Sequence, residues 1–283
     1  MNKNKKELKM KIPEKLYENN TNGKFLFIRH GQTYFNKGMS EKGLLSVNAD
    51  PNLLDSELTN EGIEKGKDKS KFYEQFNIEQ IYVSPLYRTL QSAYYLFRNH
   101  PQKDNIIIKV HPLCIEITNA VHDIPYNLIH RNKKDFNMNS EIKFDWSYFD
   151  SLYKSEKEQL FFYFDNIDTI DDKIKKEKYN LISESYGKDN YKDNICSLIK
   201  LSLEKHMESP KHVLERFNKF KDYLREKHKD TLNDNNSKVF VLTHNCFLKC
   251  GTSKTVYSYS INDDIIPNDC CSPNNFDVVS IIV

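Results

Sequence analysis

The chain has 283 residues, a mass of 33.5 kDa and a mean hydropathy of −0.72. This length can bury a full core in one large domain, or in a domain that carries an insert. With 42 basic and 40 acidic residues the formal charge is only +2, which argues against a protein that binds nucleic acid through its net charge.

Residues 1–22 are rich in Lys and Asn and lack the apolar segment of a signal peptide, so we expect a loose polar arm. No apolar run approaches the length of a membrane span. The six cysteines are scattered apart from Cys270 and Cys271, and a chain of this size does not need disulfides. We therefore expect reduced thiols and a cytoplasmic protein. Cys246 and Cys250 have no partner pair at zinc spacing, so no metal site is predicted.

The first predicted strand is the apolar run that follows Lys24 and ends at Ile28. Because it shows no alternation, it is typical of a strand buried on both faces inside a parallel sheet. Open α/β folds bind their ligands at the carboxyl edge of such a sheet. Arg29, His30 and Gly31 come next, and they offer a donor fork for phosphate, a nucleophile and room for close approach. By itself this tripeptide is equally compatible with an ordinary strand end.

Residues 37–57 are polar and broken by Gly and Pro, which predicts a loop. Thr59 then has the character of an N-cap for a helix that runs to about Phe76. A short strand is expected over Ile78–Val83.

The next helix is expected to begin with Ser84 as its cap and Pro85 at its first position. Helical spacing predicts one face directed toward the sheet, formed by Leu86, Leu90, Ala93, Tyr94 and Phe97. Arg88 falls in the first turn, where backbone amides and the helix dipole favour an anion. We interpret it as a phosphate ligand rather than a solvated surface residue.

A third strand is predicted over Ile106–Val110. Residues 118–205 then break the alternation of strands and helices, with aromatic pieces set among charged runs. We interpret this segment as a mostly helical insert that caps the site. The alternative is a surface elaboration remote from it.

Ser209 and Pro210 repeat the cap-then-proline signal and start a helix. Its apolar stripe comprises Val213, Phe217, Phe220 and Leu224. A buried strand over 239–242 leads to His244, followed by a short helix over 245–251 and a last strand over 276–283. The predicted fold is a three-layer α/β/α sandwich with a mainly parallel sheet over residues 23–283, interrupted by the insert.

Four ordered motifs resemble those of the histidine phosphatase superfamily, also called the phosphoglycerate-mutase-like family, and specifically its phosphatase branch. They are Arg29-His30-Gly31-Gln32-Thr33 with Asn36, Leu58-Thr59-x-x-Gly62, Ser84-Pro85-Leu86-Tyr87-Arg88-Thr89-x-Gln91-Ser92-Ala93, and Val241-Leu242-Thr243-His244. A weaker match is Leu113-x-x-Glu116. One departure is Asn245, where many relatives have Gly after the second histidine.

The resemblance implies that His30 attacks phosphorus and forms a phosphohistidine that water later hydrolyses. Arg29 and Arg88 would neutralise the phosphoryl oxygens, and His244 would hydrogen-bond the transferring group. Asn36 matches a position that contacts substrate or phosphate.

Thr33 is predicted to support the phosphate-binding loop. Glu116 is the predicted general acid for the leaving oxygen, with Asp123 and His122 as reserve candidates. To stay protonated near neutral pH, Glu116 would need its pKa raised by burial or by the charge of the substrate.

The sequence therefore predicts a phosphoric monoester hydrolase of the histidine acid-phosphatase kind, with no metal and no cofactor. Its substrate is a small phosphorylated metabolite or a phosphopeptide, and nucleic acid and membranes are not expected partners. A homodimer is suggested only by analogy. Arg131, Lys133 and Lys134 could bind a second anionic group, although such clusters are usually solvated.

The alternative is a phosphoglycerate mutase that uses the same intermediate. It is disfavoured because the chain ends on the strand at Val283 and the residues around Glu116 differ from the mutase pattern. A third hypothesis, an inactive scaffold that binds phosphorylated ligands, conflicts with the presence of every charged residue that the mechanism needs.

Overall fold

The computed structural model describes residues 17–138, 140–201, 207–253 and 270–283. Residues 1–16 of the predicted arm, and residues 139 and 202–205 of the predicted insert, lie outside these ranges. In the described part of the chain a mixed seven-stranded sheet has the order β1-β7-β2-β6-β3-β4-β5. Strands β2, β6, β3, β4 and β5 are parallel to their neighbours in this series, whereas β7 is antiparallel to β2 and β1 to β7.

The strands are β1 (Tyr17–Glu18), β2 (Phe25–Arg29), β3 (Asn77–Val83), β4 (Ile107–Val110), β5 (Lys143–Asp145), β6 (Ser237–Thr243) and β7 (Val278–Ile281). The α-helices are α1 (Tyr34–Lys42), α2 (Leu44–Val47), α3 (Asn60–Tyr73), α4 (Tyr87–Phe97), α5 (Lys134–Met138), α6 (Ser147–Leu152), α7 (Glu156–Phe161), α8 (Asp172–Ser185), α9 (Tyr191–Leu201), α10 (Pro210–Lys227) and α11 (Asn245–Thr252). Short 3₁₀ or π turns connect several of them.

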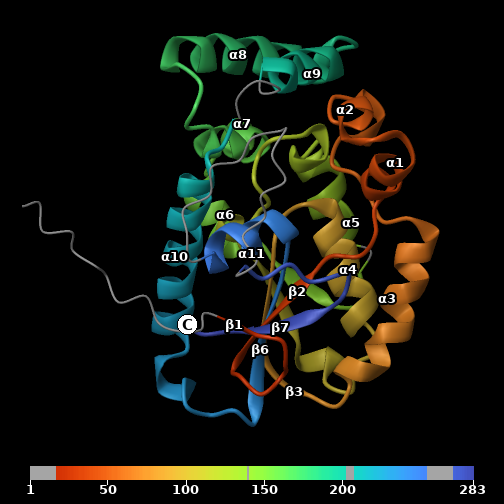
Figure 1. Cartoon of the computed structure of the whole chain (residues 1–283), viewed down its shortest axis with the longest axis vertical. Helices are drawn as coiled ribbons and strands as arrows, with labels where there is room; N and C mark the ends of the chain where they lie inside the picture. Colours follow the sequence, from red (N-terminus) through yellow and green to blue (C-terminus); the bar gives the residue numbers. More distant parts are fainter. Residues whose placement is uncertain (1–16, 139, 202–206, 254–269) are drawn as a thin grey trace, which may run out of the picture.

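Two hydrophobic clusters on opposite faces of the sheet form the core (Figure 1). Alternate residues of β2 supply both, because successive side chains of a strand point to opposite faces. Leu26 and Ile28 pack with α3 and α4, and Phe25 and Phe27 pack with α10 and α11. The three-layer sandwich and the mainly parallel sheet predicted from the sequence are thus confirmed.

Backbone hydrogen bonds align the carboxyl ends of the parallel strands. The amide of His30 donates to the carbonyl of Thr243 at 3.1 Å, and that of Ser84 donates to Leu242 at 3.2 Å. The amide of His111 donates to Val83 at 2.8 Å. The residues that follow β2, β6, β3 and β4 therefore meet at one edge of the sheet.

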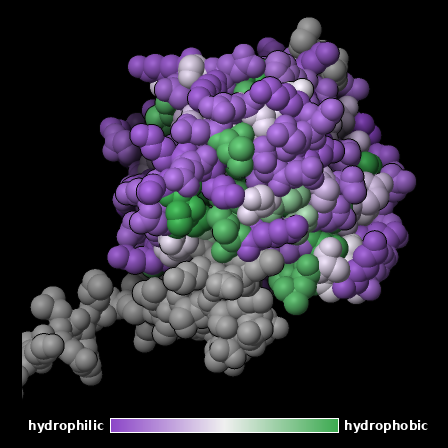
Figure 2. Space-filling view, turned by 90° about the horizontal axis from the view of Figure 1, so that it is seen from above, coloured by the Kyte–Doolittle hydropathy of each residue, from purple (hydrophilic) through white to green (hydrophobic). Residues whose placement is uncertain are grey.

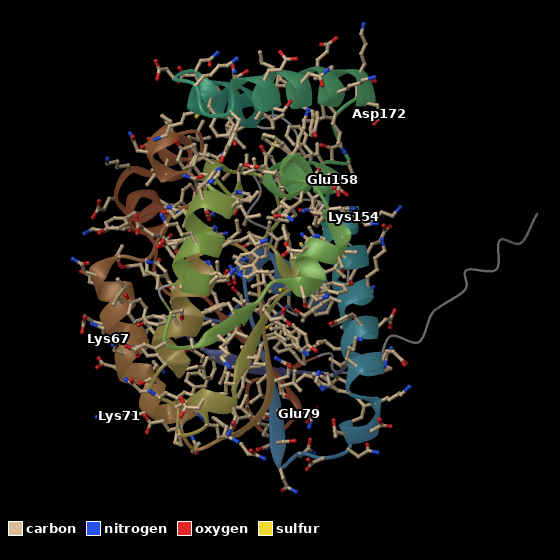
Figure 3. The ribbon with its side chains drawn as sticks, turned by 180° about the vertical axis from the view of Figure 1, so that it is seen from behind. Lys67, Lys71, Glu79, Lys154, Glu158 and Asp172 are labelled. Carbon is tan, nitrogen blue, oxygen red and sulfur yellow. The ribbon has the colours of Figure 1, made fainter. Side chains whose placement is uncertain are left out.

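The segment predicted as an insert has a core of its own, built mainly from α7, α8, α9 and the turn that follows α7. Leu54 joins this core from outside the insert. Helices α8 and α9 lie beyond the carboxyl edge of the sheet (Figure 1), and Figure 3 shows Asp172 of α8 at the opposite end of the molecule from Glu79 of β3. Seen from above, the surface is mostly hydrophilic with small hydrophobic patches (Figure 2). That the insert caps the site stays a prediction.

Three sequence-based expectations differ from the structure. The predicted loop over 37–57 contains α1, α2 and a 3₁₀ turn, because a capping box starts a helix that the glycines do not prevent. The insert also contributes strand β5, which pairs with β4 and extends the sheet. At the N-terminus, Tyr17–Glu18 of the predicted loose arm pairs with β7.

The start of α4 also differs, since the helix begins at Tyr87 rather than Pro85. The Tyr87 amide donates to Asp55 Oδ1 at 3.0 Å. The first amide of the helix is therefore capped by a carboxylate distant in sequence, and not by the Ser84 hydroxyl as expected. Arg88 nevertheless lies in the first turn, as predicted. Helix α3 ends at Tyr73, three residues before the expected end.

Gly62 packs against the backbone of the loop that follows His30. Thr59 caps α3, because its hydroxyl accepts from the Gly62 amide at 3.0 Å, and the Thr59 amide donates to the Gln32 carbonyl at 2.9 Å. A Cβ on Gly62 would lie 2.3 Å from that same carbonyl oxygen. Only glycine therefore fits here without moving the loop.

We predict that Gly62→Ala lowers the free energy of unfolding by about 1–3 kcal/mol. The added methyl would collide with the Gln32 carbonyl, which the hydrogen bond from the Thr59 amide holds in place. Urea denaturation measures the effect. Gly38→Ala is the matched control, since its Cβ would meet side-chain methyls of Val47 at 3.1 Å and Leu53 at 4.0 Å rather than backbone, and alanine favours the helix. Similar losses in the two variants would contradict the steric explanation.

Candidate functional site

His30 lies directly after β2 and is buried. Its Nδ1 is 2.7 Å from the Gly31 carbonyl oxygen. A carbonyl cannot donate, so Nδ1 carries the proton and Nε2 keeps its lone pair in the neutral ring. Burial lowers the pKa of His30 well below its usual value, and the charges of Arg88 and Arg29 lower it further. His30 is thus a neutral imidazole with an unprotonated Nε2.

Arg29 is the last residue of β2 and lies beside Glu116. Its Nη1 donates to the Pro273 carbonyl at 3.1 Å, whereas its Nε is buried with no hydrogen-bond partner among the described residues. Burial lowers the pKa of Arg29, and the Glu116 carboxylate opposes that shift. An unpaired buried N–H of this kind is costly unless a ligand accepts from it.

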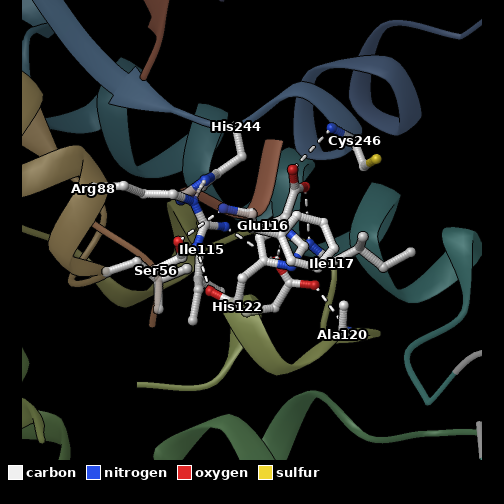
Figure 4. A network of polar contacts seen from close by, with 12 residues as sticks. Ser56, Arg88, Ile115, Glu116, Ile117, Ala120, His122, His244 and Cys246 are labelled. Carbon is white, nitrogen blue, oxygen red and sulfur yellow. Dashed lines mark hydrogen bonds and ion pairs between the residues drawn. The ribbon is translucent and has the colours of Figure 1, made fainter. Parts of the chain in front are cut away.

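Arg88 is completely buried at the start of α4. Its Nε donates to His244 Nδ1 at 3.3 Å, its Nη1 donates to the His122 carbonyl, and its Nη2 forms a 3.0 Å ion pair with Asp123 Oδ1 (Figure 4). These bonds use three of the five N–H groups of the guanidinium. The partners of Arg88 in the structure are therefore protein groups, and two N–H groups remain for a ligand.

His244 caps the start of α11 and is fully buried. Its ring lies 5.2 Å from that of His30, measured between centroids. Because Nδ1 accepts from Arg88, Nε2 carries the proton and donates to Ser84 Oγ at 2.8 Å. Burial lowers the pKa of His244 well below its usual value. Both ring nitrogens are thus engaged with protein groups, next to the nucleophile.

Glu116 is buried, and its carboxylate sits at the start of α11 (Figure 4). Oε1 accepts from the amides of Phe247 at 2.9 Å and Ile117 at 3.0 Å, and Oε2 accepts from Cys246 at 3.2 Å. The side chain is therefore held in one place. This placement shows that Asn245 is compatible with a helix start after His244.

Asp123 and His122 lie in the same network. Asp123 Oδ1 is 3.1 Å from His122 Nε2, and its Oδ2 accepts from the Ala120 amide at 3.0 Å. Burial raises the pKa of Asp123 to about 8, with Arg88 opposing and Glu116 reinforcing the shift. The His122 ring stacks on Phe35 at 3.5 Å, and its Nδ1 is buried without a partner among the described residues. Burial lowers the pKa of His122 well below its usual value.

Thr33 and Asn36 form the capping box of α1. The Thr33 hydroxyl accepts from the Asn36 amide at 3.1 Å, and Asn36 Oδ1 accepts from the Thr33 amide at 3.2 Å. Thr33 thus caps the helix that follows the His30 loop, and its support of a phosphate-binding loop stays a prediction. The side-chain oxygen of Asn36 is occupied, so a contact with substrate would fall to its amide nitrogen.

Residues 25–119 match the sequence model of the histidine phosphatase superfamily (branch 1). This part of the chain is therefore similar to members of that superfamily. The match covers the first three motifs and Glu116, whereas His244 follows it in the chain. No curated protein matches the chain in sequence.

Solved structures similar to this chain include both phosphatases and a mutase. The alpha-ribazole phosphatase from Shigella flexneri is 12% identical, with 80% of this chain and 76% of that chain covered and a TM-score of 0.38. The phosphoglycerate mutase from Bacillus anthracis str. Sterne is 12% identical, with coverage of 82% and 79% and a TM-score of 0.39. The phosphoserine phosphatase from Entamoeba histolytica, in complex with 3-phosphoglyceric acid, is 17% identical, with coverage of 81% and 77% and a TM-score of 0.36. Likeness at this level says nothing about the substrate of this chain.

The structure brings Arg29, His30, Arg88, Glu116 and His244 together at the carboxyl edge, whereas Thr33 and Asn36 cap the helix that follows His30. Two residues of the second basic cluster instead bind carboxylates of the protein. Arg131 pairs with the buried Asp55 at 2.9 Å and stacks on Tyr87, and Lys133 pairs with Asp150 at 2.6 Å. These two cations are structural.

In the described ranges no group of three or more His, Cys, Asp or Glu residues is arranged to hold a metal ion. None of the helices there combines the length and apolar character that a membrane crossing requires.

Sequence reasoning missed Arg216, which contacts the segment that carries Glu116. It lies on the buried side of α10, where Val213, Phe217 and Phe220 gave the helical pattern. A charged residue next to such an apolar stripe was the only available signal. Its contacts depend on a segment one hundred residues earlier in the chain.

We predict that His30 stays neutral at pH values where an unfolded histidine is charged. Since its folded pKa is lowered, the unfolded state binds the extra proton below pH 6.5, so this contribution to stability is complete above pH 6.5 and is lost as the pH falls. Between pH 7.5 and 5.5 the free energy of unfolding of the wild type should fall by about 1.4 kcal/mol more than that of His30→Asn. Urea denaturation at both pH values measures this difference, and equal losses would refute it.

Proposed function

We propose that this protein is a metal-independent phosphomonoester phosphatase that forms a phosphohistidine on His30. The observation that carries the proposal is the state of that ring. Gly31 holds the proton on Nδ1, and burial with two nearby guanidiniums keeps the ring neutral. An uncharged imidazole with a free lone pair on Nε2 is the form that attacks phosphorus.

The charges around His30 suit a phosphoryl group. A phosphomonoester is an anion, so the nucleophile needs nearby cations to approach it. Arg29 offers a buried N–H that has no partner in the described part of the chain, and Arg88 has two N–H groups beyond those that donate to described protein groups. Fixed guanidinium donors in a buried site would stabilise the transferring group without the help of a metal ion.

The leaving oxygen needs a proton as its bond to phosphorus breaks and the bond from His30 Nε2 to phosphorus forms. Glu116 is the donor we propose, because its carboxyl lies beside Arg29, which we expect to bind the phosphoryl group. Asp123 is the second candidate, because burial raises its pKa and its carboxyl lies against Arg88. In the second step water attacks phosphorus and gives a proton to the carboxylate left by the first step, while the electron pair of the N–P bond returns to Nε2. The substrate class remains a small phosphorylated metabolite or a phosphopeptide.

We predict that His30→Asn abolishes phosphate release from an aryl phosphate, because asparagine has no nucleophilic nitrogen. Rapid alkaline quench of the wild type with a ³²P-labelled substrate should trap acid-labile phosphate on a peptide that contains His30. Circular dichroism checks that the variant keeps its fold. Substantial turnover by a folded variant would refute the assignment.

The same assay separates hydrolysis from phosphoryl transfer between hydroxyls. With 3-phosphoglycerate as the probe, release of inorganic phosphate should exceed formation of the 2-isomer, with or without bisphosphoglycerate. Rapid isomerisation with little free phosphate would favour the mutase hypothesis instead. Binding of phosphate esters with neither reaction would favour the inactive scaffold.

We predict that Glu116→Gln reduces kcat/KM for an alkyl phosphate by about 10²–10⁴-fold. For an aryl phosphate kcat/KM should fall far less, because a phenolate leaves without protonation. Glutamine keeps the shape and one acceptor, which can serve the amides of Ile117 and Phe247, but it cannot donate a carboxyl proton. Steady-state kinetics on both esters measure the contrast.

Asp123→Asn is the matched control for this assignment. If Glu116 is the acid, Asp123→Asn should reduce kcat/KM for both esters to a similar extent, because the change alters the contact with Arg88. A selective loss on the alkyl ester in Asp123→Asn, with equal losses in Glu116→Gln, would transfer the acid role to Asp123.

A further inference from the structure

A buried ion pair lies behind the proposed acid, outside the motifs. Glu208 is fully buried just before α10, and Arg216 of α10 is 4% exposed. Arg216 Nε donates to Glu208 Oε1 at 2.9 Å, and Arg216 Nη2 donates to Oε2 at 3.1 Å. Burying two charges is expensive, and such a pair is weak evidence for added stability. Its remaining contacts indicate another role.

Every other N–H of the Arg216 guanidinium donates to the segment that carries Glu116. Nη1 donates to the carbonyls of Leu113 at 2.7 Å and Ile115 at 2.8 Å, and Nη2 donates to the carbonyl of Glu116 itself at 3.3 Å. With the two bonds to Glu208, all five N–H groups are used. One planar side chain thus holds three carbonyls of a four-residue turn.

Glu208 holds the same segment from its other side. Its Oε2 accepts from the Thr118 amide at 2.9 Å, while Oε1 also lies 3.0 Å from His212 Nδ1. The segment is tied a third time by Thr243, whose hydroxyl donates to the Cys114 carbonyl at 2.7 Å. The backbone on both sides of Glu116 is therefore fixed by groups that do not touch its carboxylate.

The carboxylate is held by a separate element. The amides of Cys246 and Phe247 at the start of α11 donate to it (Figure 4). The Arg216 guanidinium lies 5.2 Å from the Phe247 ring centroid, and a Cβ on Gly251 of α11 would lie 2.2 Å from the Phe217 ring of α10. The two helices that hold the backbone and the carboxylate are thus packed closely together.

We infer that Arg216 and Glu208 are positioning residues that set the place of the Glu116 carboxyl in the site. This inference rests on the proposed role of Glu116 as proton donor. Proton transfer requires hydrogen-bond reach, and a displacement of about 1 Å can cost about 10²-fold in rate. Lysine would keep the charge opposite Glu208, but it lacks the planar fork that spans several carbonyls.

The first test measures position without activity. Amide hydrogen exchange in Arg216→Lys should lose protection at Ile117 and Thr118, whose amides donate to Glu116 and Glu208, while the amide of Gly31, which donates to Ser92, stays protected. Arg225→Lys is the matched control on the same helix, because Arg225 is half exposed and pairs only with Asp222. Unchanged protection at Ile117 and Thr118 in a folded Arg216→Lys would overturn the inference, whatever the enzyme hydrolyses.

The second test asks whether position matters for proton donation. Arg216→Lys should lower kcat/KM by about 10- to 100-fold on an alkyl phosphate and by only a few-fold on an aryl phosphate. In the Glu116→Gln background the selective loss should vanish, because both changes act through one carboxyl. A purely structural role would give equal losses on both esters, additive with Glu116→Gln, and would overturn the inference.

Glu208→Gln is the second variant if Arg216→Lys does not fold. It keeps the shape and the acceptor for Thr118, and it should show the same pattern with a smaller loss. Wild-type enzyme that releases no phosphate from either ester would contradict the proposed function, and the exchange data would still decide the position of the turn. Wild-type turnover with a selective Glu116→Gln effect but no selective effect in Arg216→Lys or Glu208→Gln would contradict the inference alone.

Discussion

The register of the parallel strands is the constraint on which the site depends. The residue that follows each of β2, β3 and β4 donates its backbone amide to a carbonyl at the end of a neighbouring strand. His30, Ser84 and His111 are therefore aligned by backbone hydrogen bonds. These bonds are obligatory in a buried sheet, since an unpaired amide there is costly. A shift of one residue would turn His30 to the other face and separate it from His244. The chemistry of the edge is thus a consequence of sheet geometry.

Burial gives these aligned side chains their electrostatic character. Water would screen two guanidiniums and three imidazoles, but in this enclosed edge the imidazoles respond by losing their protons. The guanidiniums stay charged, because arginine does not deprotonate in proteins. Positive charge is therefore concentrated on Arg29 and Arg88, and the histidines remain neutral. This division of roles suits an anionic substrate and a histidine nucleophile.

Local sequence signals were enough to predict most helices and strands, because helix caps, proline at a helix start and apolar periodicity each involve only a few neighbouring residues. They placed β2, β3, β6 and α10 within a residue or two of the structure. The misses depend on contacts across the chain. Strand β5 exists because β4 offers an open edge, and α4 begins where Asp55 supplies an acceptor 32 residues away. In the site, sequence motifs pointed to the residues that we expect to bind phosphate, whereas the partners of Arg88 and the contacts of Arg216 with the segment of Glu116 depend on the fold.

Asp55 links the predicted cap to the catalytic edge. Its carboxylate is fully buried, accepts from the first amide of α4, and also accepts from Arg131 and Asn132 of the insert at 2.9 Å each. Its backbone has a φ of +44°, a conformation that a non-glycine residue keeps only where surrounding contacts impose it. Arg88 is the next residue after that capped amide. Moving the insert away from α4 would therefore remove hydrogen-bond donors from the buried Asp55 carboxylate. Because Asp55 also accepts from the amide next to Arg88, the free-energy cost of that loss couples the position of the insert to the residue that we expect to bind phosphate.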